Sequence, residues 1–122
     1  MKRTAPMPRW FVAVLLWAPL PALSFNLGFL RDAPASFFTE RDWELVREAV
    51  EHALQTAEDS QTIAWQNPAS GHLGSVTPVR TTEEQSRPCR VLKIQNQAQK
   101  ASAESYHRFC KQPGGGWKAV TE

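Results

Sequence analysis

Residues 89–110 read CRVLKIQNQAQKASAESYHRFC, and this stretch decides the β half of the fold. Two strand-like runs, 90–95 and 104–110, are separated by a polar segment rich in small residues, which is typical of an antiparallel hairpin. If the hairpin is centred between Gln99 and Lys100, the numbers of facing residues add up to about 199. The sequence therefore predicts both a hairpin and its register.

The two cysteines of the chain, Cys89 and Cys110, face each other in this register without any adjustment. Directly opposed residues have Cβ atoms about 4.5–5.5 Å apart, close to the approach that a disulfide needs. The bridge closes a loop of about 22 residues, worth roughly 3.4 kcal/mol in the chain-entropy model. A redox-active pair is the lesser alternative, because the chain has no C-x-x-C motif and Cys89 follows a proline instead of opening a helix.

Residues 1–24 have the order of a secretory signal peptide. A basic start precedes the apolar run Trp10–Ala18, and the small residues Ala22 and Ser24 precede a possible cut before Phe25. An uncleaved N-terminal anchor is the alternative. Because no cysteine follows the apolar run directly, we expect no lipid attachment of the lipoprotein type. The expected location is the periplasm, with outer-membrane association left open.

Composition indicates one folded domain. The chain has 122 residues, is 42% hydrophobic and contains five tryptophans, which argues against disorder. Its 14 basic and 12 acidic residues become 11 and 12 once the three basic residues of the leader are removed. Charge therefore gives no support to nucleic-acid binding. No apolar stretch reaches the roughly 18 residues of a membrane-spanning helix.

The region before the strands divides into an arm and a helix. The apolar segment 25–38 has no regular period, so it is either an extended arm packed on the domain or a partly ordered linker. A helix is predicted from Thr39 to about Ala57, with Thr39 as cap and Asp42 completing a variant of the capping box. Its apolar stripe consists of Trp43, Val46, Val50, Ala53, Leu54 and Ala57.

β signals dominate after the helix. Further strands are expected at 62–66, 73–82 and 117–120, and Pro78 requires an edge position or a bulge. The predicted fold of 39–122 is α+β: one N-terminal amphipathic helix packed on a four- to five-stranded antiparallel sheet with one disulfide. The sheet face toward the helix is expected to hold Ile63, Trp65, Leu92, Ile94, Phe109 and Trp117.

Residues 62–81, TIAWQNPASGHLGSVTPVRT, and 109–118, FCKQPGGGWK, resemble the C-terminal domain of the rickettsial-type bacterial surface antigen family, the seventeen-kilodalton antigen and its relatives. The resemblance covers about residues 40–120. Many relatives carry a lipobox cysteine and a glycine-zipper segment before this domain, and this sequence shows neither; the pair Gly114 and Gly115 stands in place of the acid–glycine turn. The resemblance implies a cell-envelope protein of unknown molecular role and supplies no catalytic residues.

A search for reactive motifs leads to no site. The histidines His52, His72 and His107 lack metal-ligand spacing and are expected as scattered surface or half-buried residues. There is no G-x-S-x-G elbow, and the glycine run 114–116 lacks the Lys-Ser/Thr pair of a phosphate-binding loop. We therefore predict no catalytic, cofactor-binding or metal-binding residues and no enzyme.

The sequence is compatible with two main classes of function. The first is a binding domain for another envelope protein or a glycan, through aromatic and arginine anchors on an exposed patch. The candidate residues are Tyr106, Arg108, Arg90, Trp65 and Trp117. The second is a structural or stress-related periplasmic protein without a fixed ligand, in which Trp65, Trp117 and Tyr106 are all buried. A small hydrolase or redox enzyme is a remote third alternative, and the oligomeric state is not predicted.

Overall fold

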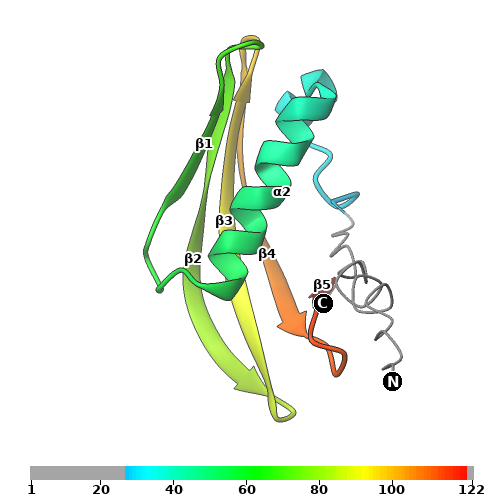
Figure 1. Cartoon of the computed structure of the whole chain (residues 1–122), viewed down its shortest axis with the longest axis vertical. Helices are drawn as coiled ribbons and strands as arrows, with labels where there is room; N and C mark the ends of the chain where they lie inside the picture. Colours follow the sequence, from blue (N-terminus) through cyan, green and yellow to red (C-terminus); the bar gives the residue numbers. More distant parts are fainter. Residues whose placement is uncertain (1–26, 121–122) are drawn as a thin grey trace, which may run out of the picture.

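The computed structural model describes residues 27–120, in which one helix lies against one face of a five-stranded antiparallel sheet (Figure 1). The strands follow one another in the sheet in the order β1-β2-β3-β4-β5. The elements are η1 (Pro34–Phe37), α2 (Glu40–Gln55), β1 (Ile63–Asn67), β2 (His72–Glu84), β3 (Arg87–Ala98), β4 (Ala101–Lys111) and β5 (Trp117–Val120). The predicted α+β fold is confirmed. The predicted leader and its cleavage site lie outside the described residues.

Helix α2 starts where the capping signal places it. The amide of Asp42 donates to Thr39 Oγ1 at 3.1 Å, and the amide of Thr39 donates to Asp42 Oδ2 at 2.8 Å. Both halves of the capping box are therefore present. The helix ends at Gln55, two residues before the predicted end, because the amides of Thr56 and Ala57 both turn back to the carbonyl of His52.

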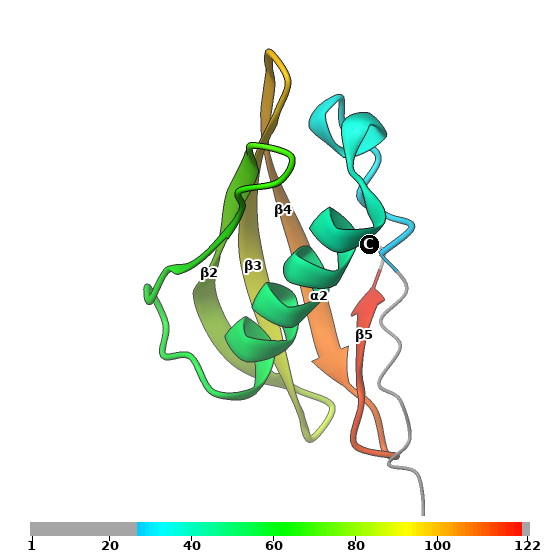
Figure 2. The ribbon, with the colours of Figure 1, turned by 45° about the horizontal axis from the view of Figure 1, so that its top comes forward.

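The core lies between α2 and the sheet, and Figure 2 shows the helix lying obliquely across the sheet. The predicted stripe of the helix faces inward, with Val46, Val50 and Ala53 fully buried. All six predicted sheet residues belong to this core. Trp65, Leu92, Ile94 and Phe109 are buried, and Ile63 and Trp117 are partly buried and packed against them.

The hairpin of β3 and β4 has the predicted register, from Cys89 opposite Cys110 to Ala98 opposite Ala101. Its strands are longer than predicted, because the polar residues of 96–103 continue the ladder up to a two-residue turn. Gln99 in this turn has a φ of 57°, as tight hairpin turns require. Polar composition alone suggested a loop, but a strand with one solvent-facing side also carries polar residues.

Strand β2 contains the irregularity that Pro78 predicts. The register with β3 shifts between Pro78 and Arg80, which is a β-bulge. The strand then continues to Glu84, two residues beyond its predicted end at 82, so the connection to β3 is short. It consists of Gln85 and Ser86, both with positive φ.

The described part of the N-terminal arm packs as an integral layer of the core. Leu27 and Leu30 are buried. The ring of Phe29 lies 5.5 Å from that of Phe109, and the ring of Phe38 lies 5.4 Å from that of Trp65. Of the two alternatives for this segment, the packed arm agrees with these contacts. Within residues 27–120 there is no helix with the length and apolar character needed to cross a membrane.

Candidate functional site

One face of the sheet is left open by the helix. Side chains alternate between the two faces of each strand, so the face opposite α2 is set by the register. This open face carries three rows across β2, β3 and β4: Leu73, Gln97 and Ser102; then Ser75, Gln95 and Glu104; then Thr77, Lys93 and Tyr106. Tyr106 is 57% exposed there.

The first two rows line a shallow, open hollow of about 510 Å³ on the sheet surface. The hollow is lined by side chains of those two rows, with the backbone beneath them: Leu73, Ser75, Gln95, Gln97, Ser102 and Glu104. Its side chains are linked across the strands: Ser75 Oγ donates to Gln95 Oε1 at 3.3 Å, and Gln95 Nε2 donates to Glu104 Oε1 at 3.1 Å. The hydroxyl of Tyr106 donates to the second oxygen of Glu104 at 3.4 Å, which ties the aromatic ring to the rim of the hollow.

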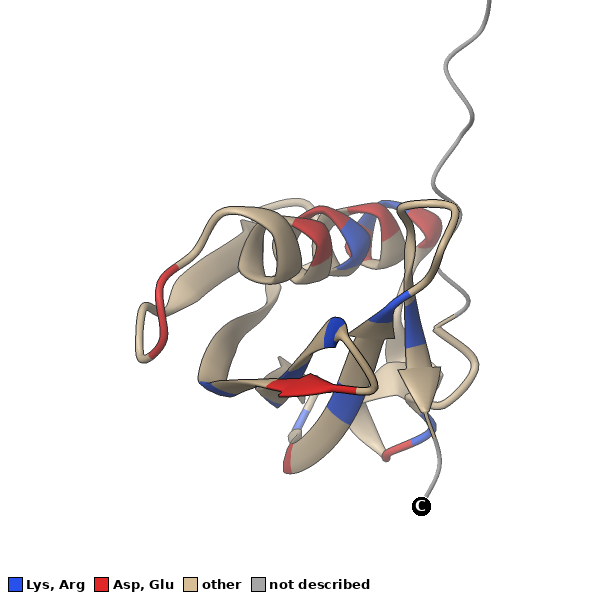
Figure 3. Ribbon diagram, turned by 90° about the horizontal axis from the view of Figure 1, so that it is seen from below, with Lys and Arg blue, Asp and Glu red and all other residues tan. Residues whose placement is uncertain are grey.

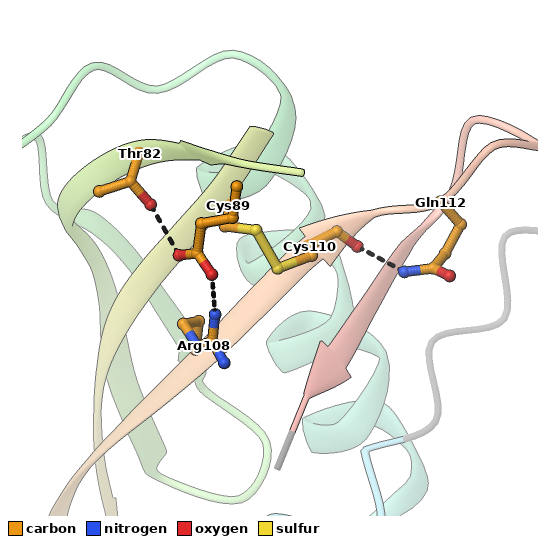
Figure 4. The surroundings of a disulfide bond; sticks show 6 residues. Thr82, Cys89, Arg108, Cys110 and Gln112 are labelled. Carbon is orange, nitrogen blue, oxygen red and sulfur yellow. Dashed lines mark hydrogen bonds and ion pairs between the residues drawn. A yellow bond between two sulfur atoms is a disulfide. The ribbon is translucent and has the colours of Figure 1, made fainter. Parts of the chain in front are cut away.

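The predicted disulfide is present at the opposite end of the open face (Figure 4). The sulfur atoms of Cys89 and Cys110 are 2.08 Å apart, and both residues are buried. Glu84 accepts hydrogen bonds from Thr82 and Arg108, and its carboxylate lies within 4.8 Å of both sulfurs. These contacts lower the pKa of Glu84, the Thr82 bond more than the Arg108 bond.

In the described part of the chain, Glu84, Cys89 and Cys110 bring three potential metal ligands close together. Metal coordination by cysteine uses the thiolate. With the two sulfurs bonded to each other, neither thiolate is present. The oxidised protein therefore offers only the carboxylate of Glu84 at this place.

The predicted partner-binding residues do not form one surface. Tyr106 and Arg108 share the open face, but Trp65 and Trp117 pack on the core side. Arg90 pairs with Phe109 across the hairpin and also points to the core side, only 9% exposed. Strand alternation therefore separates the five candidate residues between the two faces of the sheet, and only Tyr106 and Arg108 remain candidates for binding on the open face.

Arg90 instead closes the C-terminal end of α2. Its guanidinium donates to the carbonyls of Ala53 and Leu54, to Thr81 Oγ1 and to Asp59 at 3.1 Å. Free carbonyls and the helix dipole both favour a cation at this end. Asp59 has a lowered pKa, mainly because Thr81 donates to it and also because Arg90 lies beside it.

A buried polar cluster around Asp42 was not foreseen. Asp42 is fully buried, and its carboxylate accepts from Asn67 at 2.7 Å, Ser70 at 2.8 Å and His72 Nδ1 at 2.7 Å, besides the amide of Thr39. Burial raises the pKa of Asp42, but these four hydrogen bonds outweigh it and hold the pKa well below its ordinary value. His72 is 4% exposed, so the expectation of a surface or half-buried histidine is wrong for this residue.

The other two histidines differ from each other. His52 is exposed on α2. His107 is half-buried, with its ring 4.5 Å from that of Phe29 and one nitrogen 2.8 Å from Ser105 Oγ. Burial lowers the pKa of His107, and the charge of Asp32 offsets this in part.

Most of the charged side chains of α2 are at least partly exposed to solvent. Acidic and basic residues both occur along α2 (Figure 3), and Glu40, Arg41, Glu44 and Glu48 are exposed. Arg41 and Glu44 form an exposed ion pair at 3.0 Å, which contributes little to stability.

Comparison with known proteins identifies the family. The family model described as "17 kDa outer membrane surface antigen" matches residues 52–118, more than half of the chain. The chain belongs to this family. The "17 kDa surface antigen" of Rickettsia conorii is 34% identical over 86 residues, 66% of this chain and 52% of that protein. The corresponding antigens of Rickettsia prowazekii and Rickettsia bellii are 33% and 30% identical over the same length.

The chain spans about half the length of these curated relatives. No solved structure matches it. The family and these relatives are described as surface antigens, and the descriptions name no reaction. Membership of the surface antigen family therefore indicates the cell envelope and leaves the molecular role to be argued from the site.

The motif in residues 62–81, by which the surface antigen family is recognised, stabilises the fold. Gly74 lies opposite Trp65, and a Cβ on Gly74 would come within 2.5 Å of the indole nitrogen and of the Gln95 carbonyl. Asn67 binds Asp42 through its side chain and accepts the amide of Gly71 through its carbonyl. The motif therefore builds the β1–β2 hairpin and joins it to α2, whereas the open face lies outside these interactions.

Proposed function

We propose that this chain is an exported, non-enzymatic envelope protein that binds another envelope component, a protein or a glycan, through the open face of its sheet. The observation that carries the proposal is Tyr106, a large aromatic side chain 57% exposed at the rim of a hollow on that face. Exposed aromatic side chains on rigid elements are frequent anchors of binding sites.

The exposure of Tyr106 also distinguishes binding from a purely structural role. A structural protein is expected to bury Trp65, Trp117 and Tyr106 together. Trp65 is buried and Trp117 is partly buried, but Tyr106 projects from the opposite face. Of the two hypotheses, binding accounts for the position of the tyrosine.

The disulfide and the family support an envelope location. Disulfides persist in oxidising compartments such as the periplasm. The description of the family names an outer membrane surface antigen. The sequence pattern of residues 1–24 adds an export signal. We propose export to the periplasm, with the open face available to the envelope.

The polar cluster supports a non-enzymatic role although it contains Ser70, His72 and Asp42. A serine nucleophile needs a hydrogen bond to the histidine. Here Ser70 donates to Asp42, and the far nitrogen of His72 faces the amide of Gln99 at 3.3 Å. Asp42, Asn67 and His72 are buried. Through its hydrogen bonds to Asp42 the cluster joins α2 to the β1–β2 turn, and the hydroxyl of Ser70 is engaged in that link.

Site-specific photocrosslinking in cells tests the proposal. A photoreactive amino acid replaces Tyr106 on the open face or, as control, Glu48 on the exposed side of α2. We expect the Tyr106 position to give a discrete heavier adduct, or covalent retention in the detergent-washed envelope fraction, and the Glu48 position to give neither. Equal labelling from both positions, or none from Tyr106, would contradict binding through the open face.

A further inference from the structure

We propose that the hollow on the open face binds a glycan chain of N-acetylated amino sugars. This inference rests on the proposed function and narrows its ligand to one chemical class. The relevant features are the polarity of the lining, its lack of basic groups, and the aromatic ring at its rim.

The lining consists mostly of neutral hydrogen-bonding groups. Two primary amides, Gln95 and Gln97, and two hydroxyls, Ser75 and Ser102, line the hollow. Each amide carries two donors and an acceptor, and each hydroxyl both donates and accepts. Sugar hydroxyls and acetamido groups offer the same neutral donors and acceptors, so a sugar can satisfy this lining without burying a charge.

The charge of the lining disfavours other partners. Its one charged side chain is Glu104, which accepts hydrogen bonds from hydroxyl and amide groups but repels phosphate and other anions. A protein partner usually meets an apolar interface centre, whereas the hollow has one large aliphatic side chain, Leu73. Neutral polar groups are therefore the better match.

The ring of Tyr106 lies where it can contact a sugar that is bound in the hollow. Tyr106 follows Glu104 on the same face of β4, and its hydroxyl is bonded to that carboxylate at 3.4 Å. The exposed ring is a flat apolar surface next to polar groups, which suits the C–H face of a pyranose ring. Because both residues lie on one strand, the ring and the carboxylate are held in fixed register before any ligand binds.

The volume is also appropriate. The hollow measures about 510 Å³, within the roughly 300–1,000 Å³ typical of ligand pockets. It spans β2, β3 and β4, and the Ser75–Gln95–Glu104 hydrogen bonds cross these strands. A glycan chain lying across the strands would meet this line of polar groups along its length.

Co-sedimentation with protease-treated peptidoglycan sacculi tests the inference, with cellulose as a polymer that lacks acetamido groups. The protein is used with its disulfide formed. The variants are Gln97→Ala in the hollow, Tyr106→Ala and Tyr106→Phe at the rim, and Gln55→Ala on the exposed end of α2 as a matched control. Equal thermal unfolding midpoints establish that all four variants are folded.

We expect saturable binding to sacculi and none to cellulose. Gln97→Ala and Tyr106→Ala should raise the half-saturating concentration about tenfold, whereas Tyr106→Phe, which keeps the ring, should raise it less and Gln55→Ala not at all. The inference is overturned by absent binding, by equal binding to cellulose, or by hollow variants that bind like Gln55→Ala. If the Tyr106 photocrosslinker still captures a protein, only the glycan inference fails, and the proposed binding function stands.

Discussion

Replacing Asp42 by asparagine is the sharpest test of the cluster that joins α2 to the sheet. The two side chains have the same shape, so the change is electronic and leaves packing intact. Each carboxylate oxygen accepts two hydrogen bonds, Oδ1 from Asn67 and Ser70, and Oδ2 from Thr39 and His72. In either orientation the new amide nitrogen replaces an acceptor that two donors now use.

Hydrogen bonds to a charged group are worth about 1.5–3 kcal/mol each. Some donors can rotate to accept from the new amide, so we expect Asp42→Asn to lower the free energy of unfolding by about 3 kcal/mol. This is a large part of the ~5–15 kcal/mol of a typical domain. It corresponds to a fall in Tm of about 12–24 °C for a domain of this size.

The assay is urea unfolding at pH 7, followed by tryptophan fluorescence and circular dichroism. Glu40→Gln is the matched control, because Glu40 is an exposed acid in the same first turn; its loss should cost only about 0.3–0.5 kcal/mol through the helix dipole. If Asp42→Asn changes the free energy of unfolding by no more than this control, the carboxylate does not stabilise the cluster and our reasoning is refuted.

The cluster also predicts that the free energy of unfolding falls at acidic pH. The pKa of Asp42 is held below its ordinary value of 3.8 in the folded protein, so its contribution is complete above that value and is lost as the pH falls below it. The difference in stability between the unmodified protein and Asp42→Asn should therefore shrink below about pH 4. A difference that stays constant down to pH 2 would show that the charge of Asp42 is not involved.

Three further outcomes are expected. The double variant Cys89→Ala/Cys110→Ala should lose about 3.4 kcal/mol of unfolding free energy, and dithiothreitol should destabilise the unmodified protein but leave the variant unchanged. Gly74→Ala should cost about 3 kcal/mol, because its Cβ meets a backbone carbonyl at 2.5 Å, while Gly114→Ala, whose Cβ meets nothing within 4 Å, should stay within about 0.5 kcal/mol; equal effects in urea unfolding would reject the steric explanation. Burial lowers the pKa of His107 below 6.5, so the folded protein takes up this proton less readily than the unfolded chain, and stability should decline as the pH falls below about 6.5. His107→Gln should flatten that decline, and an unchanged pH profile would exclude this residue as its cause.

The features that the sequence predicted correctly are those set by neighbours along the chain or by strand periodicity. The capping box needs only Thr39 and Asp42, three residues apart. The register of β3 and β4 follows from the centre of one hairpin, which places Cys89 opposite Cys110. Pro78 cannot donate to the ladder, so it marked the irregularity of β2 in advance.

The candidate site was predicted only in part. Strand alternation in the predicted hairpin register puts Tyr106 and Arg108 on one face, opposite Phe109, and the structure has this arrangement. Arg90 was assigned to the same surface, but its partners at the end of α2 lie 36 and 37 residues away in the sequence. The hollow was missed because its lining comes from three strands and consists of ordinary polar residues, which carry no motif.

The sequence by itself determined the hairpin register, the helix start and the family, because each depends on short spacings that any fold containing them would preserve. Only the tertiary structure decided that Asp42 and His72 meet in the interior and that Arg90 reaches the carbonyls at the end of α2. The physical reason is that burial and polar pairing depend on which distant segments pack together. Strand periodicity and hydrophobicity indicate which sheet face becomes the core, but only the packing of α2 on that face decides which polar side chains meet inside it.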